Sequence, residues 1–246
     1  MRVPLTAVLR SEWTKLRTLR STWWCTAVYV LVVGSFAWLA AATTRSAPTA
    51  DSAVGVVLTG FAFGQVVLVV LGVLAVTSEF GGMALSSLVA VPRRTRLLAA
   101  KTAVVTAWAA VVTVLLVAGC VLAARTLVAV PGGVSPGDPE VLRAAGLQVA
   151  GAVLVTVLAA GLGAVLRSTA GALGLGIALV FVGPPALAIA GGRTAELLSQ
   201  ALPSLRVGED SFLAVPTTWP VGLAVAGAWA AGAWAAGAVL LERRDV

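Results

Sequence analysis

Six stretches of this chain run for at least 23 residues without a charged side chain. A bilayer core about 30 Å thick needs about 20 mostly apolar residues to be crossed by a helix. Each stretch meets that length, whereas the next longest uncharged stretch, Phe80–Pro92, has only 13 residues. The six stretches are Ser21–Thr44, Ser52–Ser78, Thr102–Ala124, Ala144–Leu166, Ser168–Gly192 and Ser211–Leu241.

These stretches predict an all-α polytopic membrane protein with six transmembrane helices and an interfacial helix at the N-terminus. We expect a single transmembrane domain over residues 1–246. Its predicted interfacial helix covers residues 3–20, and its predicted spans cover about 22–43, 55–77, 102–124, 144–166, 169–190 and 219–241.

The composition excludes several other classes of protein. Hydrophobic residues make up 59% of the 246 residues and charged residues 11%, whereas a soluble domain has about 25% charged residues. So few charges do not cover the surface of a soluble enzyme, and a mean hydropathy of +1.01 excludes a disordered chain. The chain has no histidine, and its two cysteines, Cys25 and Cys120, lie in apolar stretches. Neither a metal cluster nor a disulfide framework is indicated.

The distribution of basic residues predicts which side of the membrane each loop faces. With the N-terminus inside, the inner segments hold 12 of the 17 Lys and Arg residues. Cytoplasmic loops carry such an excess, so we expect both termini in the cytoplasm of a bacterial cell with the protein in its inner membrane. The net charge of +7 then reflects the orientation of the protein in the membrane. We expect the protein to contact the lipid bilayer and not to bind nucleic acid.

The residues before the first span form an amphipathic pattern. At 100° per residue, the apolar side chains of segment 3–20 fall within one stripe, which suits a helix lying in the inner membrane interface. Trp13 belongs to that stripe, and Lys15 and Arg17 supply basic charge. Glu12 also projects into the stripe. Two interpretations stay open: a partly exposed carboxylate paired with Lys15, or a helix face packed against protein, where Glu12 meets a basic partner such as Arg94.

The second inner segment, Glu79–Lys101, reads EFGGMALSSLVAVPRRTRLLAAK. Its two glycines interrupt the helix that leaves the second span. Residues Met83–Val91 then predict a short, mostly apolar helix that Pro92 ends, because proline disfavours a helical conformation in the residue before it. A short apolar helix on the inner side needs a cover, either the other interfacial helix or a separate cytoplasmic protein.

The outer half of the fifth predicted span contains Gly183-Pro184-Pro185. Proline removes backbone hydrogen bonds, so we expect a bend or an end near Gly183, followed by short helices over Ala186–Leu205 that dip into the outer leaflet. The sixth span contains GAWAAGAWAAG (Gly227–Gly237), whose small residues predict close helix packing.

Ionisable side chains deep in a span mark ion paths and proton relays, and the six uncharged stretches have none. This pattern disfavours an ion-driven carrier. A phosphate-binding loop of the form G-x-x-x-x-G-K-[ST] is also missing from the sequence, since neither lysine follows a glycine. We therefore expect this chain to have no catalytic residues and no cofactor. If transport uses ATP, we expect a partner chain to hydrolyse it.

The segments LRSEWTKLRTLRSTWW (Leu9–Trp24) and TSEFGGMALSSLVAVPRRTRLLAAK (Thr77–Lys101) resemble the membrane subunit of bacterial ATP-binding-cassette (ABC) exporters, type 2 permease family. The likeness extends to the layout of the whole chain. Its most specific element is the spacing of Glu79, Pro92-Arg93-Arg94 and Lys101. One departure is that relatives often have a basic residue and a threonine soon after the glutamate, where this chain has Gly82-Met83-Ala84.

The resemblance implies a dimer of six-span subunits, either two copies of this chain or two different chains, that binds two cytoplasmic ATP-binding subunits. It also implies that the short helix after the second span is a coupling helix seated in a groove of the ATPase. The residues that would form this docking contact are Glu79, Met83, Leu85 and Leu88, with Arg93, Arg94 and Arg96 beside them.

We therefore predict a permease subunit that moves a hydrophobic or amphipathic solute outward. Two alternatives stay open. The first is a membrane anchor or assembly protein that transports nothing, and the second is an ion-driven carrier.

Overall fold

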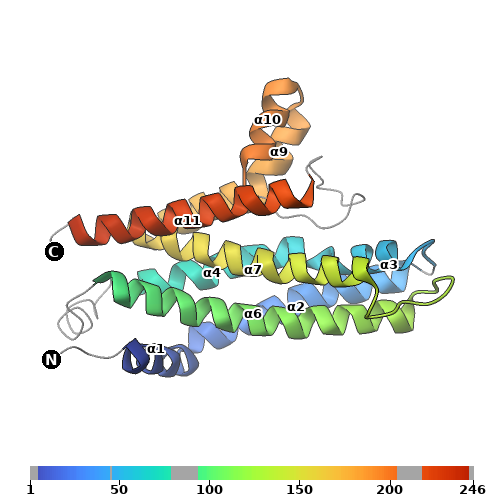
Figure 1. The fold of residues 1–246 in the computed structure, drawn as a ribbon, viewed down its shortest axis with the longest axis horizontal. Helices are drawn as coiled ribbons and strands as arrows, with labels where there is room; N and C mark the ends of the chain where they lie inside the picture. Colours follow the sequence, from blue (N-terminus) through green and yellow to red (C-terminus); the bar gives the residue numbers. More distant parts are fainter. Residues whose placement is uncertain (1–4, 45, 79–93, 204–217, 244–246) are drawn as a thin grey trace.

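The computed structural model describes residues 5–44, 46–78, 94–203 and 218–243, which fold almost entirely into helices (Figure 1). The elements are α1 (Leu5–Thr18), α2 (Arg20–Thr43), α3 (Ala50–Leu58), α4 (Gly60–Thr77), α6 (Arg94–Leu127), α7 (Pro139–Leu166), α8 (Thr169–Ile177), the π-helix η1 (Ala178–Val182), α9 (Gly183–Ala190), α10 (Arg193–Ala201) and α11 (Trp219–Arg243).

Six helical stretches in the described part of the chain are long and apolar enough to cross a membrane. They are Arg20–Thr43, Ser52–Thr77, Thr95–Leu127, Pro139–Leu166, Thr169–Leu187 and Trp219–Arg243. The predicted fold class, an all-α polytopic membrane protein, is confirmed.

Helices α2, α4, α6, α7 and α11 run side by side along the long axis of the bundle (Figure 1). The first described residues of the chain, the end of α4, the start of α6 and the end of α11 all lie at one end, which we call the inner end after the predicted orientation. Helix α7 is central and contacts α4, α6, α8 and α11. Because protein surrounds it, polar Thr156 is buried there and donates a hydrogen bond to the Ala152 carbonyl oxygen within the helix.

Small residues allow α7 to approach α11 closely. A Cβ atom added to Gly161 would lie 2.6 Å from the backbone C of Ala233 and from the backbone N of Trp234. On the facing helix, a Cβ atom on Gly237 would lie 2.8 Å from the Cβ of Ala164. Such close backbone approach is how membrane helices gain packing energy without a hydrophobic driving force. The GAWAAGAWAAG segment therefore packs against α7, as its small residues predict.

The second span changes direction at Thr59, which separates α3 from α4. Its amide donates to the Val56 carbonyl oxygen three residues back, so the helix is locally tighter than an α-helix. Just after this point, a Cβ atom on Gly60 would lie 2.8 Å from the Val33 carbonyl oxygen of α2. The change of direction therefore occurs where α4 makes its close contact with α2.

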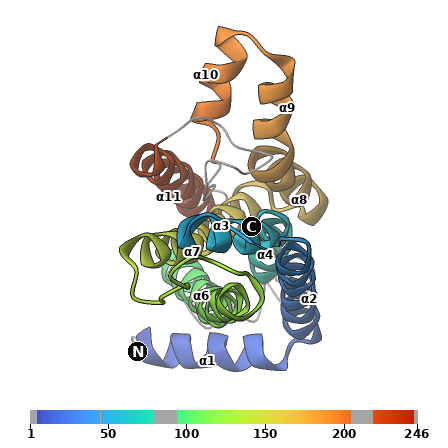
Figure 2. The same ribbon diagram turned by 90° about the vertical axis from the view of Figure 1, so that its right-hand side faces the viewer.

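The fifth predicted span, about 169–190, is divided among α8, η1 and α9. The Gly183 amide donates to the Ala178 carbonyl oxygen five residues back, a π-helical bond that accommodates the two following prolines, which lack an amide hydrogen. Helices α9 and α10 form a hairpin that projects away from the bundle (Figure 2). The Trp229 indole Nε1 donates to the Ala201 carbonyl oxygen at 2.7 Å and connects the end of α10 to α11.

We predict that Gly161→Ala lowers the stability of the protein because its methyl group overlaps the α11 backbone. Overpacking of a tight contact costs typically about 1–3 kcal/mol, which thermal unfolding of the purified protein in detergent measures. The matched control is Gly146→Ala on the same helix, where an added Cβ meets nothing within 4 Å. Equal unfolding temperatures for the two variants would show that α7 and α11 are not in tight contact.

Candidate functional site at the inner end

Helix α1 lies across the inner end of the bundle, beneath α6 and roughly perpendicular to the spans (Figure 2). Part of its apolar stripe faces protein, since Val8 and Leu16 are buried, whereas Trp13 of the same stripe is exposed. Arg10 and Arg17 are exposed too. This arrangement is expected of an interfacial helix, with basic side chains available to lipid headgroups.

Glu12 is the centre of an ion-pair cluster. Its carboxylate is buried, with 3% of the side chain exposed, and it accepts a hydrogen bond from the Lys15 ammonium through Oε1 and from the Lys101 ammonium through Oε2, both at 2.7 Å. Lys15 belongs to α1 and Lys101 to α6. The cluster therefore joins the interfacial helix to the third span. Glu12 is the one charged residue classed as buried in the described part of the chain.

The environment of Glu12 lowers its pKa. Burial is the largest single influence and opposes ionisation, but the charges and hydrogen bonds of Lys101 and Lys15 together outweigh it. The pKa of Glu12 therefore lies below the ordinary value, and the carboxylate is ionised at neutral pH.

Of the two interpretations of Glu12, the structure supports the packed one, with a different partner. The carboxylate is not partly exposed, and it contacts Lys101 as well as Lys15. The basic partner that the structure shows on α6 is Lys101. Arg94, the example expected from the sequence, begins α6 seven residues before Lys101 on the same continuous helix. Two helical turns, about 10 Å, separate these two residues along the helix. Sequence spacing alone did not decide which of the two basic residues lies at the depth of Glu12.

A cluster of aromatic rings surrounds the joint between α1, α2 and α6. The Trp108 ring on α6 makes edge-to-face contacts with Trp13 and Trp23, at centroid distances of 5.8 and 5.4 Å. The Trp23 indole donates to the Arg17 carbonyl oxygen, and the Trp108 indole donates to the Thr26 hydroxyl at 3.0 Å. Trp108 did not stand out in the sequence, although it lies seven residues after Lys101 and so on the same helix face.

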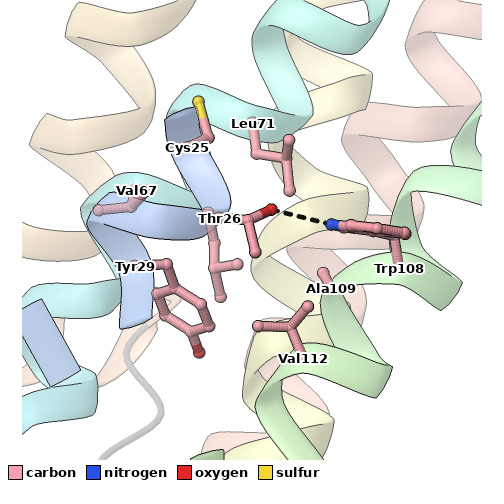
Figure 3. Close-up of a pocket in the computed structure, with 9 residues that line it drawn as sticks. Cys25, Thr26, Tyr29, Val67, Leu71, Trp108, Ala109 and Val112 are labelled. Carbon is pink, nitrogen blue, oxygen red and sulfur yellow. Dashed lines mark hydrogen bonds between the residues drawn. The ribbon is translucent and has the colours of Figure 1, made fainter. Parts of the chain in front are cut away.

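A cavity of about 230 Å³ opens between α1 and the inner ends of α2, α4 and α6. Its polar lining includes Glu12, Lys15, Ser21, Ser78 and Lys101, and its apolar lining includes Leu71, Leu74, Ala75 and Val104. Next to it, a much smaller space of about 10 Å³ is lined by Thr26, Tyr29 and Trp108 (Figure 3). The two spaces share Cys25 and Leu71 as lining residues. Thr26 and Trp108, which line the smaller space, are joined by a hydrogen bond (Figure 3).

Most of the predicted docking residues lie outside the described residues: Glu79, Met83, Leu85, Leu88 and Arg93. Arg94 begins α6, and Arg96 is exposed. The residues on either side of this segment are firmly packed. Val76, before it, and Leu98, after it, form a buried cluster with Leu241 of α11, and Leu97 packs with Val8 of α1. The ends of segment 79–93 are thereby connected to both terminal helices.

The fold is that of an α-helical multi-pass membrane protein whose N-terminal helix packs against the inner end of the bundle. The particular family follows from comparison with known families, in which residues 8–184 match the ABC-2 family transporter protein. This match covers well over half of the chain, so the chain belongs to the ABC-2 family and is a membrane-spanning permease of an ABC transporter. No curated protein was found to match it.

We predict that Glu12→Gln destabilises the protein by about 1.5–3 kcal/mol, the range for a hydrogen bond to a charged group. The variant leaves two ammonium groups facing each other at the inner end without the carboxylate between them. Combining it with Lys101→Met should cost less than the sum of the single changes, because the two residues interact directly. Glu242→Gln is the matched control, since that carboxylate is exposed. Additive losses in the double variant would show that Glu12 and Lys101 do not interact.

The lowered pKa of Glu12 predicts how stability depends on pH. A carboxyl group with a lowered pKa in the folded state contributes stability that is complete above its ordinary pKa and is lost as the pH falls through the folded-state pKa. The difference in unfolding temperature between the natural protein and Glu12→Gln should therefore be largest at neutral pH and shrink under acidic conditions. A difference that grows on acidification would contradict the ionised state of Glu12.

Proposed function

We propose that this permease is the membrane subunit of an exporter that moves a hydrophobic or amphipathic solute outward. The observation that carries the proposal is that the six uncharged stretches contain no Asp, Glu, Lys, Arg or His. A protein without such groups has no site at which a coupling ion or proton changes the energy of a span. The energy for transport would come from ATP hydrolysed by a separate cytoplasmic subunit, and members of this family generally work with such a partner.

We place the contact with the ATPase at the coupling helix predicted within Glu79–Val91. Support comes from the packed residues around that segment. A displacement of segment 79–93 would act on α4 through Val76 and on α6 through Leu97 and Leu98, and these residues contact α11 and α1 in turn. A force applied to this segment from the inner side would therefore be transmitted to α4, α6, α11 and α1.

The proposed transporter contains two permease subunits. We place the path of the solute between the two subunits. Apolar side chains such as Leu31, Trp38 and Leu115 are exposed on the described spans, and such faces suit contact with lipid or with a second subunit.

The proposed orientation has both termini in the cytoplasm of a bacterial cell, with the protein in its inner membrane. The excess of basic residues at the inner end supports it.

We expect Leu85→Arg or Leu88→Arg to abolish co-purification with the proposed ATP-binding subunit, because a charged side chain does not enter an apolar groove without loss of affinity. Membrane insertion should be unchanged. The matched control is Leu127→Arg at the opposite end of α6, where the leucine is exposed. Retained binding by both test variants would remove the docking contact from this segment.

A second experiment separates an exporter from a membrane anchor. The permease and its ATPase, reconstituted together in lipid vesicles, should hydrolyse ATP faster in the presence of a transported amphiphile. An unstimulated ATPase and no movement of any tested solute would favour the anchor. Movement that follows a pH gradient without the ATPase would favour an ion-driven carrier.

A further inference from the structure

The cavity at the inner end has the polarity of an amphiphile-binding site. Along α4 its lining changes from Leu71, Leu74 and Ala75 to Ser78, over seven residues, or about 10 Å of helix. On α6, Val104 lies on the apolar side and Lys101 on the polar side. The polar side is the one nearer the inner end of the bundle, where lipid headgroups would lie.

The charges around the cavity favour an anion. Two lysines, Lys15 and Lys101, lie in its described lining, and both contact Glu12 there. Lys15 has 42% of its side chain exposed. Four exposed arginines, Arg10, Arg17, Arg20 and Arg96, lie on the neighbouring parts of α1, α2 and α6. Basic residues near a membrane surface each attract anionic lipid by about 1 kcal/mol.

The size of the cavity limits how much of a ligand it holds. Its volume of about 230 Å³ lies below the roughly 300–1,000 Å³ of pockets that enclose a drug-sized molecule, so the cavity does not enclose a complete lipid. The residues of its lining farthest from the inner ends of the helices are Cys25, Leu71 and Val104. A bound molecule would therefore place its headgroup and first carbon atoms between α1 and the bundle, with the rest of its chains outside.

From these observations we propose that the cavity between α1 and the inner ends of α2, α4 and α6 binds the headgroup of an anionic phospholipid from the inner leaflet. The phosphate lies near Lys15 and Lys101, and the first part of the acyl chain lies against Leu71, Leu74 and Val104. The lipid thereby fills the space beneath the interfacial helix. This site is independent of the proposed ATPase contact and of the transported solute.

The thiol of Cys25 provides a natural probe of whether the cavity is occupied. Cys25 is half-buried and lines the cavity, and its sulfur points away from the smaller space lined by Tyr29 (Figure 3). The other cysteine, Cys120, is buried and serves as an internal reference. Alkylation of Cys25 by N-ethylmaleimide, which is uncharged, therefore reports whether the cavity is occupied.

The experiment compares the full-length protein in nanodiscs of phosphatidylcholine alone with nanodiscs of phosphatidylcholine and phosphatidylglycerol in equal parts. Peptide mass spectrometry follows alkylation at each cysteine. We expect phosphatidylglycerol to slow alkylation of Cys25 by roughly fivefold, the change that one basic residue at the membrane surface produces. In the Trp24→Cys variant, the introduced thiol, at the same depth but on the exposed side of α2, should show no such protection.

Two charge variants test whether the protection of Cys25 comes from lipid bound in the cavity or from the general positive charge of the surface. Lys15→Gln removes a positive charge from the cavity lining and should abolish the protection of Cys25 by phosphatidylglycerol. Arg17→Gln removes the same charge from an exposed position of α1 that does not line the cavity, and it should retain the protection.

Three results would overturn the proposal. The first is equal alkylation in both nanodiscs, and the second is equal loss of protection in Lys15→Gln and Arg17→Gln. The third is protection by inorganic phosphate in phosphatidylcholine nanodiscs, which would assign the cavity to a soluble anion instead of a lipid. None of these results depends on ATPase binding, so failure of the docking contact and failure of the lipid site are separately recognised.

Discussion

The exclusion of charge from the hydrocarbon region constrains every other feature of this permease. Because charged side chains are costly inside a bilayer, they gather at the ends of the spans, and the described chain buries one carboxylate, Glu12, at the inner end. There, ammonium groups of Lys15 and Lys101 offset the cost of its burial. Because the spans carry no charges in this region, they associate mainly through close packing of their surfaces. The glycines of α7 and α11 allow these two helices to approach closely.

Much of the fold follows from simple rules of length and charge. The number of spans, the interfacial helix and the bend before Pro184 could be predicted because each depends on local sequence: an uncharged stretch, a stripe at helical spacing, a missing amide hydrogen. The change of direction at Thr59 could not, since it occurs where Gly60 meets the backbone of Val33. That contact joins two different spans and leaves no local sequence signal.

At the inner-end site too, local sequence predicted some features, whereas contacts between distant residues could not be predicted. A carboxylate in an apolar stripe left two interpretations of Glu12 open, and its partner depended on how far α6 extends beyond the predicted span. The helix begins at Arg94 and not near residue 102, so it carries the basic residues Arg94, Arg96 and Lys101, and Lys101 contacts Glu12. Trp108 was missed for a related reason: its partners, Trp13, Trp23 and Thr26, come from distant parts of the chain.

The connections around segment 79–93 suggest why the interfacial helix matters to a transporter of this kind. Helix α1 is joined to α6 twice, by the Glu12–Lys101 ion pair and by the contact of Val8 with Leu97. A rotation of α6 driven from its inner end would therefore carry α1 with it, and α1 continues almost directly into α2 at Arg20. In this arrangement the first and third spans would move as one unit, while Val76 and Leu241 connect the second span to the sixth. A force applied at one inner segment would thus reach two pairs of spans, which is what alternating exposure of the proposed path between two subunits requires.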